Sequence, residues 1–237
     1  DFDRLPAAQF WTSRMNSEAR IPDSWPYNWI FTIKRVTAAT NWRTLIPCII
    51  PRGPVSYTLY CIYFPQELVQ SGKAAFLMGA LGSLIVDYCI RHKTGQPSLP
   101  IWCPEQVPIL PPSEVTDSDI SFVLPRLSLL VSTSNTIAEF ASDFGLPALK
   151  PSWDPHLRAI AQAELDAFYA YKYGLTRREL TYVLDPKSAM GENFPSESFR
   201  ALKDKEIREL GEFRTYRLVH EAWDRLFASG INMMSSL

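Results

Sequence analysis

A donor-rich segment separates two apolar runs, residues 29–33 and 45–50, in the first quarter of the chain. The side chains in and beside it that suit a polar partner are Lys34, Arg35, Asn41, Trp42 and Arg43. Arginine donates to guanine O6 and N7, asparagine pairs with adenine N6 and N7, and basic side chains neutralise phosphates. An indole adds a face on which a base can stack. These residue types are typical of a nucleic-acid interface.

A structural interpretation of the same segment stays open. In it, Asn41 caps a turn, Arg43 lies along the Trp42 ring, and the other charges are solvated. Two further basic residues, Arg91 and Lys93, follow later in the chain and admit the same two interpretations. Residue types and spacing alone do not choose between them.

Charge is unevenly distributed, although the formal net charge is only −1. Residues 28–100 contain seven Lys or Arg and two acidic residues, a local balance of +5. Residues 113–237 contain 14 basic and 18 acidic residues, a balance of −4. A positive first half favours an anionic partner there, although solvated lysines and arginines would give the same totals.

No motif indicates that this chain alone is a catalyst. There is no Walker loop, GxGxxG turn or GxSxG elbow. The four cysteines form no CxxC pair and there are only three histidines, so we expect no metal. Glu164 and Asp166 are expected on different helix faces. The run Lys203–Glu206 is expected on a solvated helix face rather than in a nuclease site. We therefore expect no catalytic residue here.

The elements that must position the donor-rich segment are strands. Residues 29–36, 43–50 and 55–63 are rich in Ile, Val, Tyr, Thr and Phe, and Pro and Gly interrupt them. Pro47 and Pro51 indicate that the second strand is an edge strand or is bulged.

A change of period after the strands predicts a helix over residues 76–92. It is apolar nearly all round, which is typical of a buried helix. Its polar stripe is Ser83, Asp87 and Arg91, and the last two are spaced to pair across one turn. Gly79 and Gly82 are expected to let a neighbour approach closely.

Six prolines between residues 96 and 113 predict an extended linker and a domain boundary. Helices are predicted beyond it at 127–144, after an Asp154 N-cap, after a Thr176 capping box, and at 197–210 and 212–228. The predicted fold class is α+β. It comprises an irregular lead-in at 1–27, a β-rich half with one buried helix at 28–112, and a mainly α-helical half at 113–237.

The most apolar run, residues 74–86, is too short to span a bilayer, and no signal peptide is present. Because the chain starts at Asp1 without methionine, we interpret it as a fragment of a longer protein.

Four stretches carry a family pattern. Residues 35–46 (RVTAATNWRTLI) are similar to R-x-I-A-x-A-T-N-E-R-T-L-I, and residues 85–95 (IVDYCIRHKTG) to N-S-x-x-x-D-Y-x-x-R-x-K-x-G. Residues 107–112 (VPILPP) are similar to L-P-x-x-P-P, and a fourth stretch runs from Leu124 to Leu226. Together they resemble the C-terminal part of large adenine-specific DNA methyltransferases of restriction-modification and phage-defence systems. Some of these are type II enzymes that fuse methylation to cleavage.

The resemblance implies a target-recognition region that binds double-stranded DNA, braced by a helical segment. The catalytic domain with its S-adenosylmethionine site would precede Asp1, in a bacterial or archaeal cytoplasmic enzyme, so no cofactor is expected in this chain. The residues expected near DNA are Lys34, Arg35, Asn41, Trp42, Arg43, Arg91 and Lys93. Trp42 stands where the family more often has glutamate, and both a change of specificity and drift are open explanations of this departure.

The alternative is a structural or protein-interaction domain that scaffolds the methyltransferase core. Base readers must differ between relatives, so residues that make a family recognisable are poor candidates for setting specificity. The readers would then be the loops 13–28, 51–56 and 64–74. If Arg43 and Asn41 are both buried and bonded to backbone, they are structural.

Overall fold

The sheet has three short antiparallel strands in the order β2-β1-β3. The computed structural model describes residues 12–95 and 97–227. The strands are β1 (Trp29–Lys34), β2 (Pro47–Pro51) and β3 (Leu59–Ile62). Thr32 of β1 lies opposite Cys48 of β2 and Cys61 of β3. The prolines of β2 therefore lie in an edge strand, as predicted, where a missing N–H does not interrupt the central ladder.

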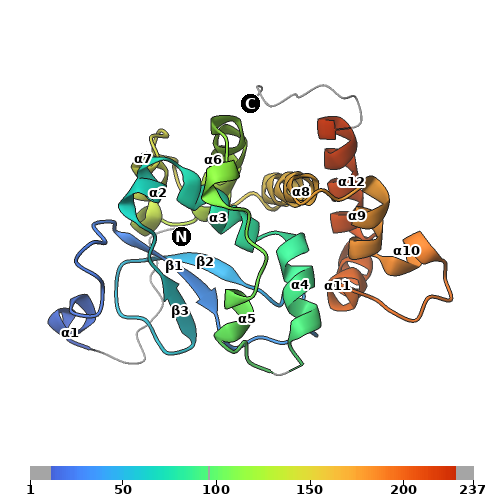
Figure 1. Ribbon diagram of the computed structural model, residues 1–237, viewed down its shortest axis with the longest axis horizontal. Helices are drawn as coiled ribbons and strands as arrows, with labels where there is room; N and C mark the ends of the chain where they lie inside the picture. The colour runs from blue at the N-terminus through green and yellow to red at the C-terminus, as the bar shows by residue number, and fades with distance from the viewer. Residues whose placement is uncertain (1–11, 96, 228–237) are drawn as a thin grey trace.

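Helices pack over one face of this sheet. The helices of the first half of the chain, on this face or beside the sheet, are α1 (Arg14–Glu18), α2 (Gln66–Gln70), α3 (Lys73–Leu81), α4 (Leu84–Lys93) and α5 (Trp102–Glu105). In Figure 1, α2 and α3 lie above the strands together with α6 (Asp117–Val131) and α7 (Glu139–Asp143). The fold is thus mixed α+β, with a small sheet and many helices. The predicted β-rich half with one buried helix is wrong, since helices α2 to α5 together span more of residues 28–112 than the three strands do.

Residues 76–92 form two helices rather than the single helix predicted. α3 and α4 are bent by 52° at Gly82 and Ser83. The Ser83 hydroxyl accepts the Val86 N–H at 3.4 Å, and the buried Asp166 carboxylate accepts the Leu84 N–H at 2.7 Å. Capped amides start a new helix even where the apolar period continues. No single helix in the described residues is long and apolar enough to cross a membrane, although this bent pair passes by length and composition.

Gly79 of α3 lets α8 (Pro155–Lys172) approach closely, as predicted. The Tyr169 hydroxyl of α8 donates to the Phe76 carbonyl at 2.7 Å. A β-carbon at position 79 would lie 2.5 Å from that hydroxyl oxygen, so a side chain there would displace the tyrosine. Gly82 has only ordinary contacts, since its β-carbon would lie 3.4 Å from the nearest atom.

The helix predicted at 127–144 has different bounds. α6 begins ten residues earlier because Thr116 and Asp119 form a capping box, with bonds of 3.2 and 3.0 Å. It continues through Pro125 and ends at Val131. The chain then passes through η2 (Asn135–Ile137) into α7.

The proline-rich segment is also more structured than predicted. It contains α5 and runs into η1 (Pro112–Glu114) rather than forming an extended linker throughout.

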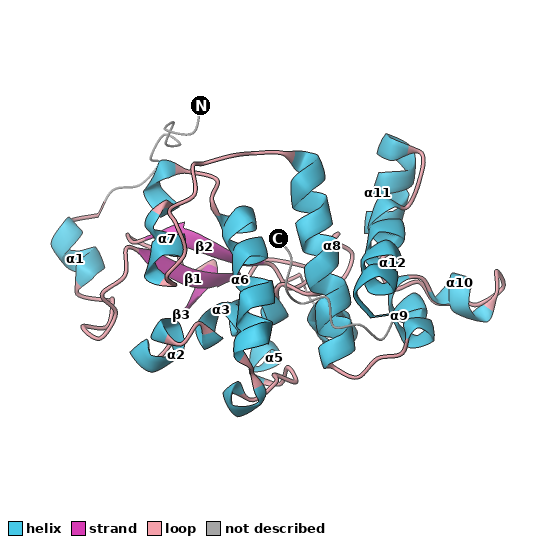
Figure 2. Cartoon of the chain, turned by 90° about the horizontal axis from the view of Figure 1, so that it is seen from above, coloured by secondary structure: helices cyan, strands magenta, loops and turns pink. Residues whose placement is uncertain are grey.

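The C-terminal helices are α8, α9 (Arg177–Leu184), α10 (Pro186–Met190), α11 (Arg200–Leu210) and α12 (Arg214–Phe227). The first two begin at their predicted caps, α10 was not predicted, and the last two begin two or three residues later than predicted. The Asp154 carboxylate accepts two amides at the start of α8, and Thr176 and Glu179 form the predicted capping box of α9. Figure 2 shows α8 standing between the sheet with its helices and the group α9 to α12.

The two halves share a hydrophobic core. One continuous cluster of buried side chains extends from Ile21 to Leu226 and includes Phe76, Phe122 and Phe168. The Trp29 indole of β1 also donates to Asp143 at the end of α7, at 2.8 Å. Hydrophobic packing therefore continues across the predicted domain boundary between residues 112 and 113.

His220 of α12 gives the helical half a pH-dependent stability. The imidazole is buried, Nε2 lies 3.3 Å from the Thr181 hydroxyl, and burial lowers its pKa with help from Arg177, against Asp224. The unfolded chain then binds a proton more readily than the folded chain. Stability is therefore expected to fall as pH drops below the usual histidine pKa of about 6.5.

The check is the free energy of unfolding in urea at pH 5 and pH 7.5, for the parent chain and for His220→Gln. The loss at pH 5 should be smaller in the variant. An identical pH dependence in both proteins would contradict the assignment to His220.

Candidate nucleic-acid interface

Arg91 of α4 holds the connection between β1 and β2 through hydrogen bonds to main-chain carbonyls. Its guanidinium donates to the Ala39 carbonyl, to the Asn41 carbonyl at 3.1 Å and to the Trp42 carbonyl at 3.1 Å. The Arg91 side chain is buried and lies 3.4 Å from the Asp87 carboxylate. Burial lowers the pKa of Arg91, and Asp87 opposes that shift. Arg91 is thus an internal support of the loop, not the DNA contact that the sequence predicted.

Asp87, one turn earlier on α4, holds the end of the same connection. Its Oδ1 accepts the Thr44 N–H at 2.8 Å and the Leu45 N–H at 3.0 Å. Because these amides donate to a carboxylate rather than to a neighbouring strand, β2 starts at Pro47 and not at the predicted residue 43. Two of the three residues of the polar stripe, Asp87 and Arg91, therefore fix residues 39–45.

Arg43 ties the connection to the helical half. Its Nη2 donates to Asp166 of α8 at 3.0 Å, and its Nη1 donates to the Gly82 carbonyl at 3.5 Å. Asp166 is fully buried, which raises the pKa of its carboxyl although Arg43 and the Leu84 N–H oppose the rise. Because its guanidinium is already paired with this carboxylate and carbonyl, Arg43 has a structural role. The predicted DNA contact at Arg43 is corrected accordingly.

Asn41, Trp42 and Lys34 face outward instead. Trp42 is 50% exposed, and Lys34 and Asn41 are exposed as well. They line a hollow of about 490 Å³ together with Thr40, Arg43 and Ile46. The Asn41 amide donates to the Thr37 hydroxyl at 3.3 Å, which orients it. A cation, an amide and an aromatic face thus converge on a loop of fixed backbone.

Lys205 of α11, in the helical half of the chain, also lies beside Trp42. Its Nζ lies 3.1 Å from the centre of the Trp42 ring, a cation–π contact. Spacing did not point to Lys205, because the contact joins two distant segments of the chain.

Arg35 and Lys93, the other two predicted contacts, do not line this hollow. The Arg35 guanidinium lies 5.8 Å from the centre of the Tyr57 ring. The Lys93 ammonium donates to the Gln106 carbonyl at 3.2 Å, beside α5.

Burial and backbone bonding of Arg43 and Asn41 would make both residues structural, and the structure gives a different answer for each. Arg43 is held by Asp166 and a carbonyl and is structural, whereas Asn41 is exposed and bonded to a side chain. The sequence placed these residues at one loop but did not separate those that support the loop from those that face outward.

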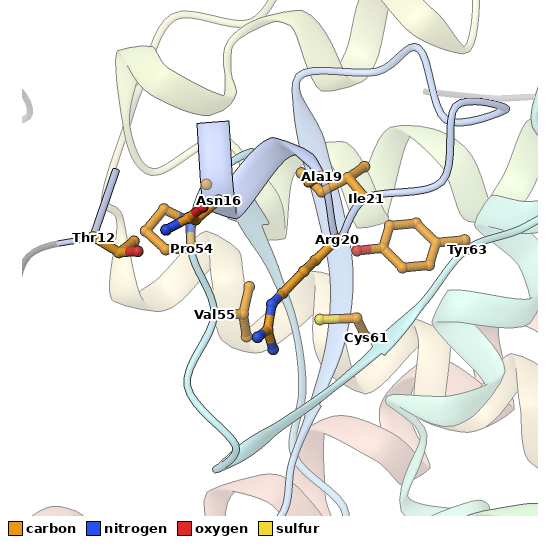
Figure 3. Close-up of a pocket in the computed structure, with 10 residues that line it drawn as sticks. Thr12, Asn16, Ala19, Arg20, Ile21, Pro54, Val55, Cys61 and Tyr63 are labelled. Atoms are coloured by element: carbon orange, nitrogen blue, oxygen red, sulfur yellow. The ribbon is translucent and has the colours of Figure 1, made fainter. Parts of the chain in front are cut away.

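A second hollow, of about 750 Å³, lies between loops 13–28 and 51–56. Figure 3 shows the Arg20 side chain pointing into it between Val55 and Cys61. The two loops are joined by Arg52, which donates to Glu18 at 2.7 Å. The Gln66 amide donates to the Ser24 carbonyl at 3.0 Å, which ties the third loop, 64–74, to the first. Of the three segments that the alternative interpretation names as readers, 13–28 and 51–56 line this hollow. Segment 64–74 does not line it, and it is not the predicted loop, because it contains α2 and the start of α3.

The run Lys203–Glu206 is not a nuclease site. Glu206 is buried and accepts both the N–H and the hydroxyl of Thr215, and Lys203 pairs with Asp185 at 2.8 Å. The expectation of a fully solvated face is wrong for Glu206, which fixes the start of α12. Within residues 12–95 and 97–227, no three His, Cys, Asp or Glu side chains are grouped to hold a metal.

The outward side chains of the loop and the hollow beside them are the features from which function is inferred. No protein-family model, curated protein or solved structure matches this chain.

Proposed function

We propose that this chain is the target-recognition and C-terminal helical part of an adenine-specific DNA methyltransferase of a restriction-modification system. Its segment 28–112 contacts double-stranded DNA, and segment 113–237 braces that contact. The observation that carries the proposal is the loop fixed by Arg91 and Asp87, which presents Lys34, Asn41 and Trp42 around one hollow.

This arrangement suits DNA for physical reasons. A loop whose backbone is already fixed loses little conformational entropy on binding, so more of its contact energy appears as affinity. Lys34 supplies a phosphate contact, Asn41 an amide for a base edge, and Trp42 a stacking face. Lys205 adds a second positive charge beside them.

Catalysis belongs to another part of the proposed enzyme. The sequence has no Asp/Asn-Pro-Pro-Tyr/Phe motif and no glycine-rich turn for S-adenosylmethionine. In the proposal, a domain preceding Asp1 binds that cofactor and receives the adenine extruded from the duplex. The proposal places the whole enzyme in a bacterial or archaeal cytoplasm.

Replacing Lys34 with Gln is expected to weaken binding to a mixed-sequence duplex and to reduce the slope of log K against log salt by about 0.9, the value for one phosphate contact. Fluorescence anisotropy between 50 and 200 mM salt measures both quantities. The matched control is Lys150→Gln, which removes an exposed lysine distant in sequence from the loop and should change neither.

Two results would count against the proposal. If Lys34→Gln matches the control in affinity and slope, the loop is not the interface. If the parent chain binds no duplex at about 100 μM, the weak limit of non-specific DNA affinity, DNA binding itself is wrong.

The alternative function is a scaffold without base readout by this loop, and the internal Arg43–Asp166 pair favours it. The residues that carry the family resemblance would then serve packing, and the hollow at Arg20 would be the contact. In that case Arg20→Gln weakens DNA binding and Lys34→Gln does not. If neither substitution matters, the chain scaffolds the enzyme without touching DNA.

A further inference from the structure

The hollow beside Trp42 has the chemistry of a nucleotide site. We propose that it binds one unpaired nucleotide, whose base stacks on the Trp42 indole while its phosphate contacts Lys34. This rests on the proposed function and extends it, because it names the state of the DNA that the loop recognises.

The exposed indole of Trp42 is carried by a backbone that is held in place. Arg91 donates to the carbonyls of Trp42 and of Asn41 before it, so the backbone that carries the ring is fixed. The ring itself is half exposed, in contrast with Trp25 and Trp29, which are buried. A fixed aromatic face costs little entropy when a ligand stacks on it.

Lys205 and the hollow occupy different parts of the ring surroundings. The Lys205 ammonium lies 3.1 Å above the ring centre on one face. The hollow is lined by Trp42 with Lys34, Thr40, Asn41, Arg43 and Ile46, and Lys205 is not among these lining residues. Lys205 is therefore a positioning residue, which holds the indole and adds positive charge for a phosphate.

The groups around the hollow match the parts of a nucleotide. The indole offers stacking, the Asn41 amide offers hydrogen bonds to a base edge, and the Lys34 ammonium offers a charge for phosphate. The volume of about 490 Å³ lies in the range of small-molecule sites. A paired base has both faces stacked within the duplex, so the base that reaches the indole must be unpaired, and it is a different base from the extruded adenine that the proposed catalytic domain receives.

The experiment compares four probes with the parent chain. They are a duplex with one 2-aminopurine opposite an abasic site, the same duplex fully paired, a single strand, and free dAMP. We expect the unpaired-base duplex to bind more tightly than the paired one, with 2-aminopurine fluorescence quenched on binding.

Trp42→Leu should weaken binding to the unpaired-base duplex by about 5- to 150-fold, the range for one base–aromatic stack, and leave the paired duplex within about twofold. Trp153→Leu is the matched control. Trp153 is 60% exposed and has Arg158 4.1 Å from its ring centre, yet it lies outside this hollow. Trp42→Phe keeps a stacking face and should restore most of the binding.

Lys205→Met tests the positioning role. It should reduce the preference for the unpaired base and the quenching, whereas Lys205→Arg retains both. Thermal unfolding of each variant confirms that the fold is kept.

The outcomes separate this inference from the proposed function. If Trp42→Leu weakens both duplexes equally, the nucleotide site is wrong and DNA binding by the loop stands. If the parent chain binds neither duplex nor the single strand, the proposed function fails. If free dAMP binds as tightly as the unpaired-base duplex and Trp42→Leu abolishes this, the site takes free nucleotides and its assignment to DNA is overturned.

Discussion

Replacing Arg91 with Met is expected to lower the free energy of unfolding by about 3–5 kcal/mol, the cost of removing one partner from a buried ion pair. The substitution leaves the carbonyls of Ala39, Asn41 and Trp42 without their donor. It also leaves the Asp87 carboxylate buried without its cation. Because domains are stable by only about 5–15 kcal/mol, the loss is a large part of the total.

Urea unfolding followed by circular dichroism measures this change. Arg208→Met is the control, since Arg208 is exposed on α11, and it should stay within about 0.5 kcal/mol of the parent chain. A loss below about 1 kcal/mol for Arg91→Met would show that the loop does not depend on this cation. DNA affinity should fall with Arg91→Met even at temperatures where the variant remains folded, because the loop loses its fixed shape.

Asp166→Ala is expected to cost a similar amount, about 3–5 kcal/mol, for a related reason. The carboxylate accepts Arg43 at 3.0 Å, the Leu84 N–H at 2.7 Å and the Gln162 amide at 3.3 Å. Its removal frees the first amide of α4 and separates the loop from α8. Asp166→Asn keeps an oxygen for the Leu84 N–H and should therefore cost less than alanine.

A double-mutant cycle assigns the loss to the Arg43–Asp166 pair. Arg43→Met combined with Asp166→Ala should cost less than the sum of the two, by about 0.5–3 kcal/mol, as for residues in contact. Strict additivity would mean that the carboxylate acts only on the helix start at Leu84, and not through Arg43.

Local signals in the sequence were reliable where the structure depends on local bonds. The Asp154 and Thr176 caps start their helices as predicted, because a cap involves side chains and amides within three residues. The Pro47–Pro51 strand is at an edge for an equally local reason, the missing N–H of proline.

Two helix boundaries were predicted wrongly. One depends on a residue in a distant segment, and at the other two local signals conflict. The break at Ser83 follows an unbroken apolar period, and the Asp166 carboxylate that helps to stabilise it comes from a helix 82 residues away. The start of α6 has a local signal, the Thr116–Asp119 box, but Pro125 within the helix argues against a continuous segment.

At the loop, the sequence shows which residue types are present but not which side chains point into the protein and which point to solvent. Arg43 and Lys34 are both basic and near the same turn, yet one pairs with a carboxylate and the other is exposed. Which is which depends on Asp166, 123 residues from Arg43, and no spacing rule connects them. The same limit explains why Lys205 was missed.

Arg91 binds the main-chain carbonyls of the loop rather than its side chains, and this has a consequence for how the DNA specificity of the proposed function can change. The shape of residues 39–42 is encoded outside those residues, on α4. Side chains at positions 40, 41 and 42 can then be exchanged while the carbonyls that Arg91 binds stay in place. Under the proposed function, single substitutions at these positions would change which DNA is preferred while the loop keeps its backbone. A laboratory library confined to these three positions should retain the fold in most of its members.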